Sequence, residues 1–84
     1  MKVSPQVICR HFGDGGVLVH LDTNQIYELN ATGYRVWELI DAGLDRASIR
    51  QRLHEEFGVA PDRLDLELAD ILAGLTSARL IVEA

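Results

Sequence analysis

The strongest constraint on the fold comes from residues 21–40, LDTNQIYELNATGYRVWELI, where a strand pattern changes directly into a helix pattern. Residues 25–29 have the alternating side chains of a short strand. Asn30 is a favoured N-cap residue, and apolar residues then recur at helical spacing as far as Ile40. The chain must therefore pass from a sheet into a helix without a linker.

Two further strands are predicted before this junction. Residues 7–12 and 17–21 flank the sequence Gly-Asp-Gly-Gly at residues 13–16, which is a strong hairpin signal. Residues 22–24, Asp-Thr-Asn, then form a second turn, because Asp and Asn side chains bond their own local backbone. Consecutive strands joined by short turns favour an antiparallel meander.

Three helices are predicted after the strands. The first covers residues 31–42, the second follows an N-cap at Asp45, and the third begins at Pro61. A run of strands followed by a run of helices indicates an α+β domain. We therefore predict a winged-helix-like fold with a three-stranded antiparallel sheet followed by three helices, in a single domain over residues 1–84. Residues 80–82 are expected to be a short apolar tail.

Size and charge exclude several classes of protein. A chain of 84 residues suffices for one domain, and its net charge of −5 argues against binding nucleic acid, which needs clustered Lys and Arg. One cysteine, Cys9, allows no internal disulfide. The N-terminal residues lack the apolar core of a signal peptide, and no run is long enough to span a membrane. We therefore expect a cytoplasmic protein that binds neither nucleic acid nor membrane.

No group of residues has the spacing of a catalytic or metal site. Cys9 and His11 fit no closed zinc site, and His20 and His54 lack an obvious carboxylate partner. The glycines of residues 13–16 are not followed by the Lys and helix start of a phosphate loop. We predict no enzyme activity, no metal and no cofactor.

The strand at residues 25–29 is the best candidate for a binding element. As the last strand of a meander it has one row of unpaired backbone groups, to which an extended peptide can add. The alternative is an edge covered by a loop or by a dimer contact. The helix that begins at Pro61 carries more apolar residues than one core-facing stripe needs, which favours binding.

Several segments resemble the PqqD-like family. They are Val-His-Leu-Asp at residues 19–22, Ile-Tyr-Glu-Leu-Asn at 26–30, Thr-Gly at 32–33 and Val-Trp-Glu-Leu-Ile at 36–40. Members of this family commonly show an "LN-x-x-G-x-x-[VI]-W" run after a short hairpin. The similarity covers nearly the whole chain and is most specific in the middle.

The resemblance implies a recognition element of ribosomal peptide natural-product pathways. Such proteins bind the leader segment of a precursor peptide, which adds as a strand and lies against the third helix, and they present it to a processing enzyme. Carried onto this sequence, the strand contacts fall on Gln25, Ile26, Tyr27, Glu28 and Leu29, and the groove wall on Leu64, Glu67, Leu68, Ile71 and Leu75. Two positions depart from the family pattern: Arg79, where Gly is usual, and Glu67, where Asp is usual.

The pathway and the partner stay open at this point. A short, acidic chain resembles the lasso-peptide members, which work with a separate leader peptidase and a cyclase. The alternative within the family is a peptide chaperone of coenzyme PQQ biosynthesis, which delivers its precursor to a radical enzyme. In another class, the helix order allows a winged-helix DNA-binding regulator. A homodimer through the open edge is a further possibility.

Overall fold

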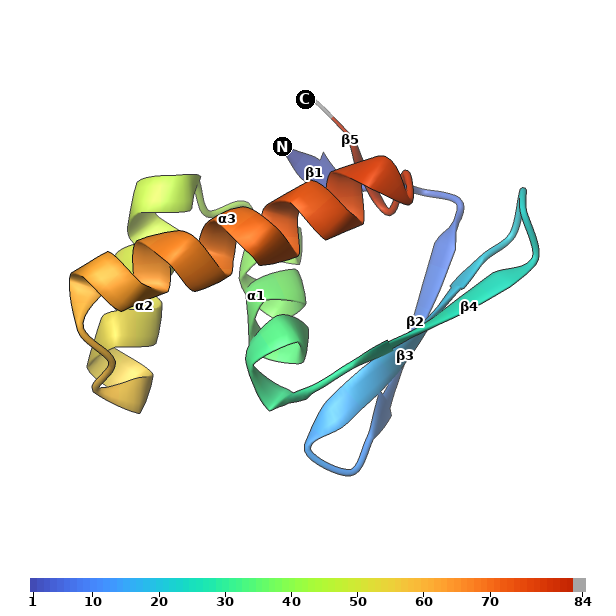
Figure 1. Ribbon diagram of the computed structural model, residues 1–84. Coiled ribbons are helices and arrows are strands. Elements are labelled where there is room, and N and C mark those ends of the chain that lie inside the picture. Colours follow the sequence, from blue (N-terminus) through green and yellow to red (C-terminus); the bar gives the residue numbers. More distant parts are fainter. Residues whose placement is uncertain (83–84) are drawn as a thin grey trace.

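Four strands precede three helices and a fifth strand follows them, and the computed structural model describes residues 1–82 of the chain. The helices gather on one side of the molecule and the sheet on the other (Figure 1). The sheet has the order β2-β3-β4, with both neighbouring pairs antiparallel. This confirms the predicted α+β fold. The bounds are β2 (Val7–Phe12), β3 (Gly15–His20), β4 (Gln25–Leu29), α1 (Ala31–Asp41), α2 (Arg46–Phe57) and α3 (Pro61–Ser77).

The two ends of the described chain pair with each other. Strand β1 (Lys2–Val3) lies antiparallel to β5 (Ile81–Val82), with Val3 opposite Ile81, and both lie beside the chain termini in Figure 1. The sequence predicted only an apolar tail here. A two-residue strand has no periodicity to detect, and its partner lies at the other end of the chain, so the pairing depends on the completed fold.

The hairpin between β2 and β3 is tighter than predicted. Only residues 13–14 form the turn, because Phe12 already pairs with Gly15 and Gly13 has a φ of +60°. Gly16 lies within the strand and not in the turn. A Cβ atom on Gly16 would lie 2.5 Å from the ring of Tyr34, so the absence of a side chain lets α1 pack closely on the sheet.

The predicted switch from strand to helix occurs at Asn30. Its backbone is extended, with φ −73° and ψ −179°, and its Oδ1 atom accepts a hydrogen bond from the Gly33 N–H at 2.8 Å. This satisfies one of the N–H groups that a helix start leaves free. Because the cap is one residue long, the end of β4 is tied directly to the start of α1.

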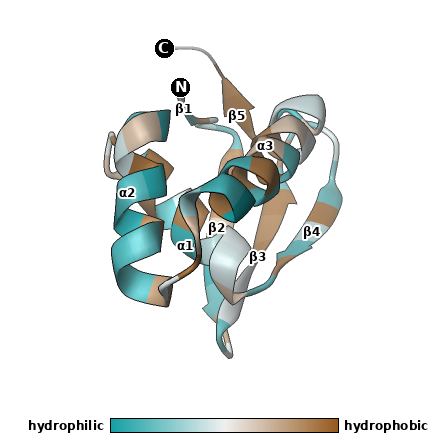
Figure 2. Cartoon of the chain, turned by 60° about the vertical axis from the view of Figure 1, so that its left-hand side comes forward, coloured by the Kyte–Doolittle hydropathy of each residue, from teal (hydrophilic) through white to brown (hydrophobic). Residues whose placement is uncertain are grey.

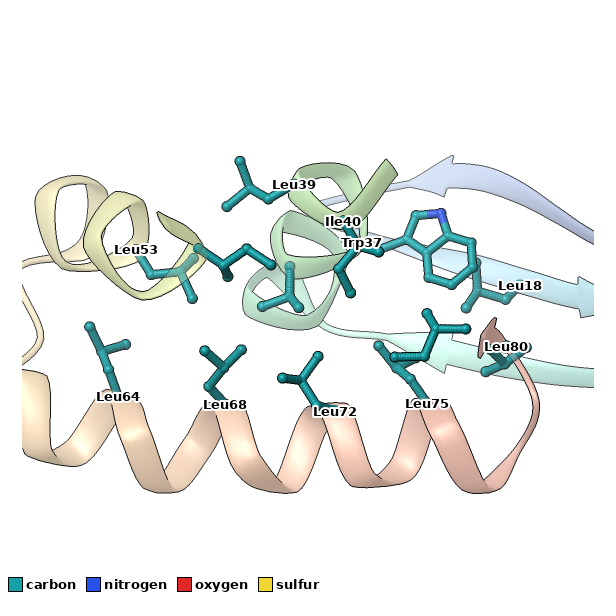
Figure 3. Packing of buried hydrophobic residues seen from close by; sticks show 13 residues of the cluster. Leu18, Trp37, Leu39, Ile40, Leu53, Leu64, Leu68, Leu72, Leu75 and Leu80 are labelled. Carbon is teal, nitrogen blue, oxygen red and sulfur yellow. The ribbon is translucent and has the colours of Figure 1, made fainter. Parts of the chain in front are cut away.

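The core lies between α3, the other two helices and the inner face of β3. Figure 3 shows the leucine row of α3 pointing toward α1 and α2, with Trp37 and Leu18 further along. Trp37 is 5% exposed and belongs to this core. The buried apolar residues are Leu18, Val36, Trp37, Leu39, Ile40, Ile49, Leu53, Leu64, Leu68, Leu72, Leu75, Leu80 and Ile81.

Three of the five arginines on the helices, Arg35, Arg50 and Arg63, are held in ion pairs. Arg35 forms two short contacts to the carboxylate of Glu56, at 2.9 and 3.0 Å, and Arg50 lies 3.2 Å from Asp65. Figure 2 shows α2 as mostly hydrophilic. The charged residues of α2 mix both signs and leave no uniform basic face.

No helix within residues 1–82 combines the length and hydropathy that a membrane crossing requires.

Candidate functional site

Strand β4 is an open edge of the sheet. Its residues pair with β3 only, and within residues 1–82 no strand lies on its other side. Figure 2 shows β4 beyond β3, with α3 in front of the sheet. One row of backbone N–H and C=O groups is therefore available to an added strand.

A groove runs between this edge and the second half of α3. It contains a hollow of about 330 Å³ whose floor includes Leu75 and Leu80. A second hollow of about 310 Å³ shares Asn30, Asp70 and Ile71 with the first and extends the groove along α3. Together they are lined by Tyr27, Glu28, Leu29, Asn30, Thr32, Gly33, Glu67, Asp70, Ile71, Gly74, Leu75, Ala78 and Leu80.

Small residues keep the groove open. Gly74 lies on the exposed surface of α3, and a Cβ atom placed on it would meet nothing within 4 Å. Ala78 follows one turn later on the same helix, and Gly33 lies across the groove on α1. Because larger side chains are missing at these positions, the partly buried Ile71 stands as the apolar wall.

The side chains of β4 divide between the two faces of the sheet. Tyr27 and Leu29 are partly buried on the inner face, where Tyr27 lies opposite the buried Leu18 of β3. Ile26 and Glu28 are exposed on the outer face. The Tyr27 hydroxyl donates a hydrogen bond to the Gln25 side chain, which also lies on the inner face. An added strand would thus meet apolar side chains inside and a mixed surface outside.

The predicted groove residues fall into two groups. All five residues of β4 lie on the open edge, and Glu67, Ile71 and Leu75 line the groove. Leu64 and Leu68 do not, because they are only 2% and 1% exposed and belong to the core. That part of the prediction is corrected. The apolar residues of α3 extend over more than one face, and only packing against α1 and α2 decides which row is buried.

The sequence interpretation missed the small and polar residues of the groove. Asn30 was assigned only as a helix cap, while Asp70, Gly74 and Ala78 were assigned no contact with a ligand. Gly74 and Ala78 are spaced four apart, and Ile71 lies three residues before Gly74. This spacing puts them on one helix face, so the signal was present in the sequence.

The groove is acidic as well as apolar. Glu67 and Asp70 line the two hollows from α3, Glu28 borders the first of them from β4 with its side chain on the outer face, and no Lys or Arg lines either hollow. Glu67 lies 3.2 Å from Arg63, whereas neither Glu28 nor Asp70 forms an ion pair within residues 1–82. A ligand with a positive charge is therefore favoured over one with a negative charge.

Cys9 provides the one thiol of the chain, and it lies partly buried on β2. Burial, together with the charges of Glu38 and Asp41, raises the pKa of the Cys9 thiol, which keeps it in the unreactive protonated form. Residues 1–82 contain no group of three or more His, Cys, Asp or Glu side chains arranged to hold a metal ion.

The sequence profile described as coenzyme PQQ synthesis protein D (PqqD) matches residues 15–81. The chain belongs to the PqqD family. The match begins at the first residue of β3 and runs into β5, so it includes β4, α3 and the whole groove. No functionally curated protein shows significant sequence similarity to this PqqD-family chain.

Two solved structures share the PqqD-family fold over almost their entire length. One is described as TbiB1 in complex with the TbiA(beta) leader peptide. It has a TM-score of 0.93 and 31% sequence identity, and the match covers 100% of this chain and 98% of that one. The other is described as lasso peptide synthetase B1 complexed with the leader peptide. It has a TM-score of 0.87 and 18% identity, with 98% and 96% of the two chains covered.

Proposed function

We propose that this chain is a single recognition domain that binds the leader segment of a ribosomally made precursor peptide. The leader adds as a strand to β4 and lies in the groove against α3. The open β4 edge beside an apolar groove is the observation that carries this proposal. The likeness to TbiB1, solved with a leader peptide, supports it over the full chain.

Two kinds of contact contribute to binding. Backbone hydrogen bonds to β4 attach any extended peptide, and each contributes a net ~1 kcal/mol. Apolar side chains entering the hollow beside Leu75 and Leu80 add burial and selectivity. We expect a dissociation constant between nanomolar and micromolar, or about −8 to −12 kcal/mol.

The domain presents the peptide and leaves the chemistry to a separate enzyme. The open edge of β4 holds a strand by its backbone, which is a binding contact and requires no catalytic group. We assign the partner to lasso-peptide biosynthesis, where it is a leader peptidase, because the relative described as a lasso peptide synthetase B1 has the same fold. A radical enzyme of PQQ biosynthesis is the alternative partner, since the family profile carries that name. Pull-down experiments with this chain as bait distinguish the two assignments. One uses the lasso-peptide leader peptidase and the other the radical enzyme of PQQ biosynthesis, and only the true partner should be retained.

The proposal is tested by titrating the fluorescently labelled TbiA(beta) leader peptide, the ligand of TbiB1, into wild type and into Ile71→Asp. A carboxylate in the groove wall must lose water when the peptide binds, so we expect affinity to fall by about 2 kcal/mol, or thirty-fold. Leu66→Asp is the matched control, because Leu66 lies on the same helix, is 73% exposed and lines neither hollow.

Circular dichroism checks that both variants are folded. Equal affinity of Ile71→Asp and Leu66→Asp would remove the groove from the proposal. A gel shift at low salt tests the DNA-binding alternative, which the acidic groove and the paired arginines disfavour. Tight DNA binding by the wild-type chain would replace peptide recognition as its function.

A further inference from the structure

The outer face of the sheet presents two rows of side chains that end at the open edge. In the first row, Ile8 of β2 lies opposite Val19 of β3, and Val19 lies opposite Ile26 of β4. Ile8 is 41% exposed and Ile26 is 67% exposed. This row is apolar throughout, so a residue added beside Ile26 would continue an apolar row.

The second row carries charge at both ends. Arg10 of β2 lies opposite Val17, and Val17 lies opposite Glu28 at the edge. The valine between them separates the two charges, and Glu28 forms no ion pair within residues 1–82. Glu28 also borders a hollow on the outer side of the sheet, beside Phe12 and Val17. Its carboxylate is therefore free to pair with a residue on the next strand.

An added strand places its side chains directly opposite those of β4. In an antiparallel pair, directly opposed residues have Cβ atoms about 5 Å apart and share a face of the sheet. Opposite charges stabilise such a pair and like charges destabilise it. A leader strand on β4 must place one side chain beside Glu28 and another, two residues away, beside Ile26.

We propose that Glu28 and Ile26 select the leader by cross-strand pairing, so that the bound segment carries Lys or Arg opposite Glu28 and an apolar residue opposite Ile26. This inference rests on the proposed function. The leader residue between these two faces the groove beside Tyr27 and is apolar. For a leader strand antiparallel to β4, the recognised element is thus a basic, apolar, apolar triplet in the order from N- to C-terminus.

The acidic groove supports the same charge preference. Asp70 and Glu67 line it from α3, so acidic leader residues are disfavoured on both sides of the added strand. A second copy of this chain is a poorer occupant of the edge. The sequence of β4, QIYEL, contains no Lys or Arg to place beside Glu28, and each copy carries a net charge of −5.

The test is a selection from an mRNA-displayed library of random twelve-residue peptides against immobilised wild-type protein and Glu28→Lys. Glu55→Lys is the control for net charge, since it makes the same substitution on the exposed surface of α2. We expect wild type and Glu55→Lys to enrich the basic triplet. We expect Glu28→Lys to enrich Asp or Glu at the basic position, with the two apolar positions unchanged.

One selected peptide is then titrated with its basic residue changed to Glu. Wild type should bind this peptide about five-fold more weakly, and Glu28→Lys should bind it more tightly than the parent peptide. Both differences should shrink as salt is raised. If wild type and Glu28→Lys enrich the same charge at that position, cross-strand selection is overturned, while the proposal of peptide binding stands. The same selection is also run against Ile71→Asp. If wild type enriches peptides no more strongly than Ile71→Asp does, the proposed function is overturned as well.

Discussion

The imidazole of His20 joins the end of β3 to the backbone of Arg79, 59 residues later in the chain. His20 is 3% exposed, and its Nε2 lies 3.2 Å from the Arg79 carbonyl oxygen. The Asp22 N–H donates to Nδ1, also at 3.2 Å. Because Nδ1 accepts, the proton that bonds the carbonyl must be on Nε2. One neutral ring therefore holds the turn before β4 against the end of α3, at one end of the groove.

His20→Ala should lower the free energy of unfolding by about 3 kcal/mol. The change leaves a buried carbonyl and an amide without their partner and also opens a cavity. Urea unfolding followed by tryptophan fluorescence measures the effect, since Trp37 lies in the core. His11→Ala is the comparison, because His11 is exposed and only stacks on Tyr34, so its loss should cost less than about 1 kcal/mol. Equal losses would deny His20 its bridging role.

Arg79→Gly should stabilise the protein. Arg79 has a φ of +59°, a left-handed conformation that costs a side-chain-bearing residue about 1–2 kcal/mol and costs glycine little. After the larger entropy of glycine in the unfolded chain is subtracted, we expect a gain of about 0.5 kcal/mol. Thermal unfolding measures it. Asn24→Gly, also at +59°, should gain less, because Asn tolerates this conformation. A melting temperature lowered by Arg79→Gly would contradict the strain.

Gly74→Leu should change stability and binding in opposite directions. Leucine has the higher helix propensity, by about 0.8 kcal/mol, and the space around Gly74 is open, so the free energy of unfolding should rise. The new side chain fills the groove, so leader affinity should fall at least ten-fold. Ala73→Leu, one residue earlier on the exposed side of α3 and outside both hollows, should keep full affinity. Unchanged affinity in Gly74→Leu would show that the peptide does not enter this part of the groove.

The pairing of α1 with α2 should weaken in acid. Hydrogen bonds from Arg35 hold the pKa of Glu56 below its usual value of 4.5. A carboxyl whose pKa is lowered by folding stabilises the folded state above its unfolded pKa, and this contribution is lost as the pH falls through the folded value. Wild type should therefore exceed Glu56→Gln in stability by at most about 1 kcal/mol at pH 7, because the pair is partly exposed. Urea titrations at pH 7 and pH 3 should show this advantage shrinking as the pH falls; an advantage independent of pH would exclude the ion pair as its source.

Local signals in the sequence were enough for the order of elements and for the helix starts. Asn30 and Asp45 each cap a helix through a hydrogen bond to a backbone N–H three residues later, which is a contact within one turn of chain. The four-residue spacing of Ile49, Leu53 and Phe57 predicts one helix face, but only the first two are buried, and Phe57 is 45% exposed at the end of α2. A periodic pattern predicts a helix face, but neighbouring elements determine how far along the helix that face is covered.

By itself the sequence determined that a three-stranded meander precedes three helices, that β4 passes straight into α1 and that the last strand of the meander has a free edge. These features depend on alternation, capping and turn residues, whose interactions span a few positions. Only the tertiary structure decided which side of α3 is buried, and with it that Leu64 and Leu68 serve the core while Gly74, Ala78 and Ile71 shape the groove. It also decided the pairing of β1 with β5 and the bridge from His20 to Arg79. The reason is the same in each case: the partners lie far apart in the chain and meet only when the core has closed.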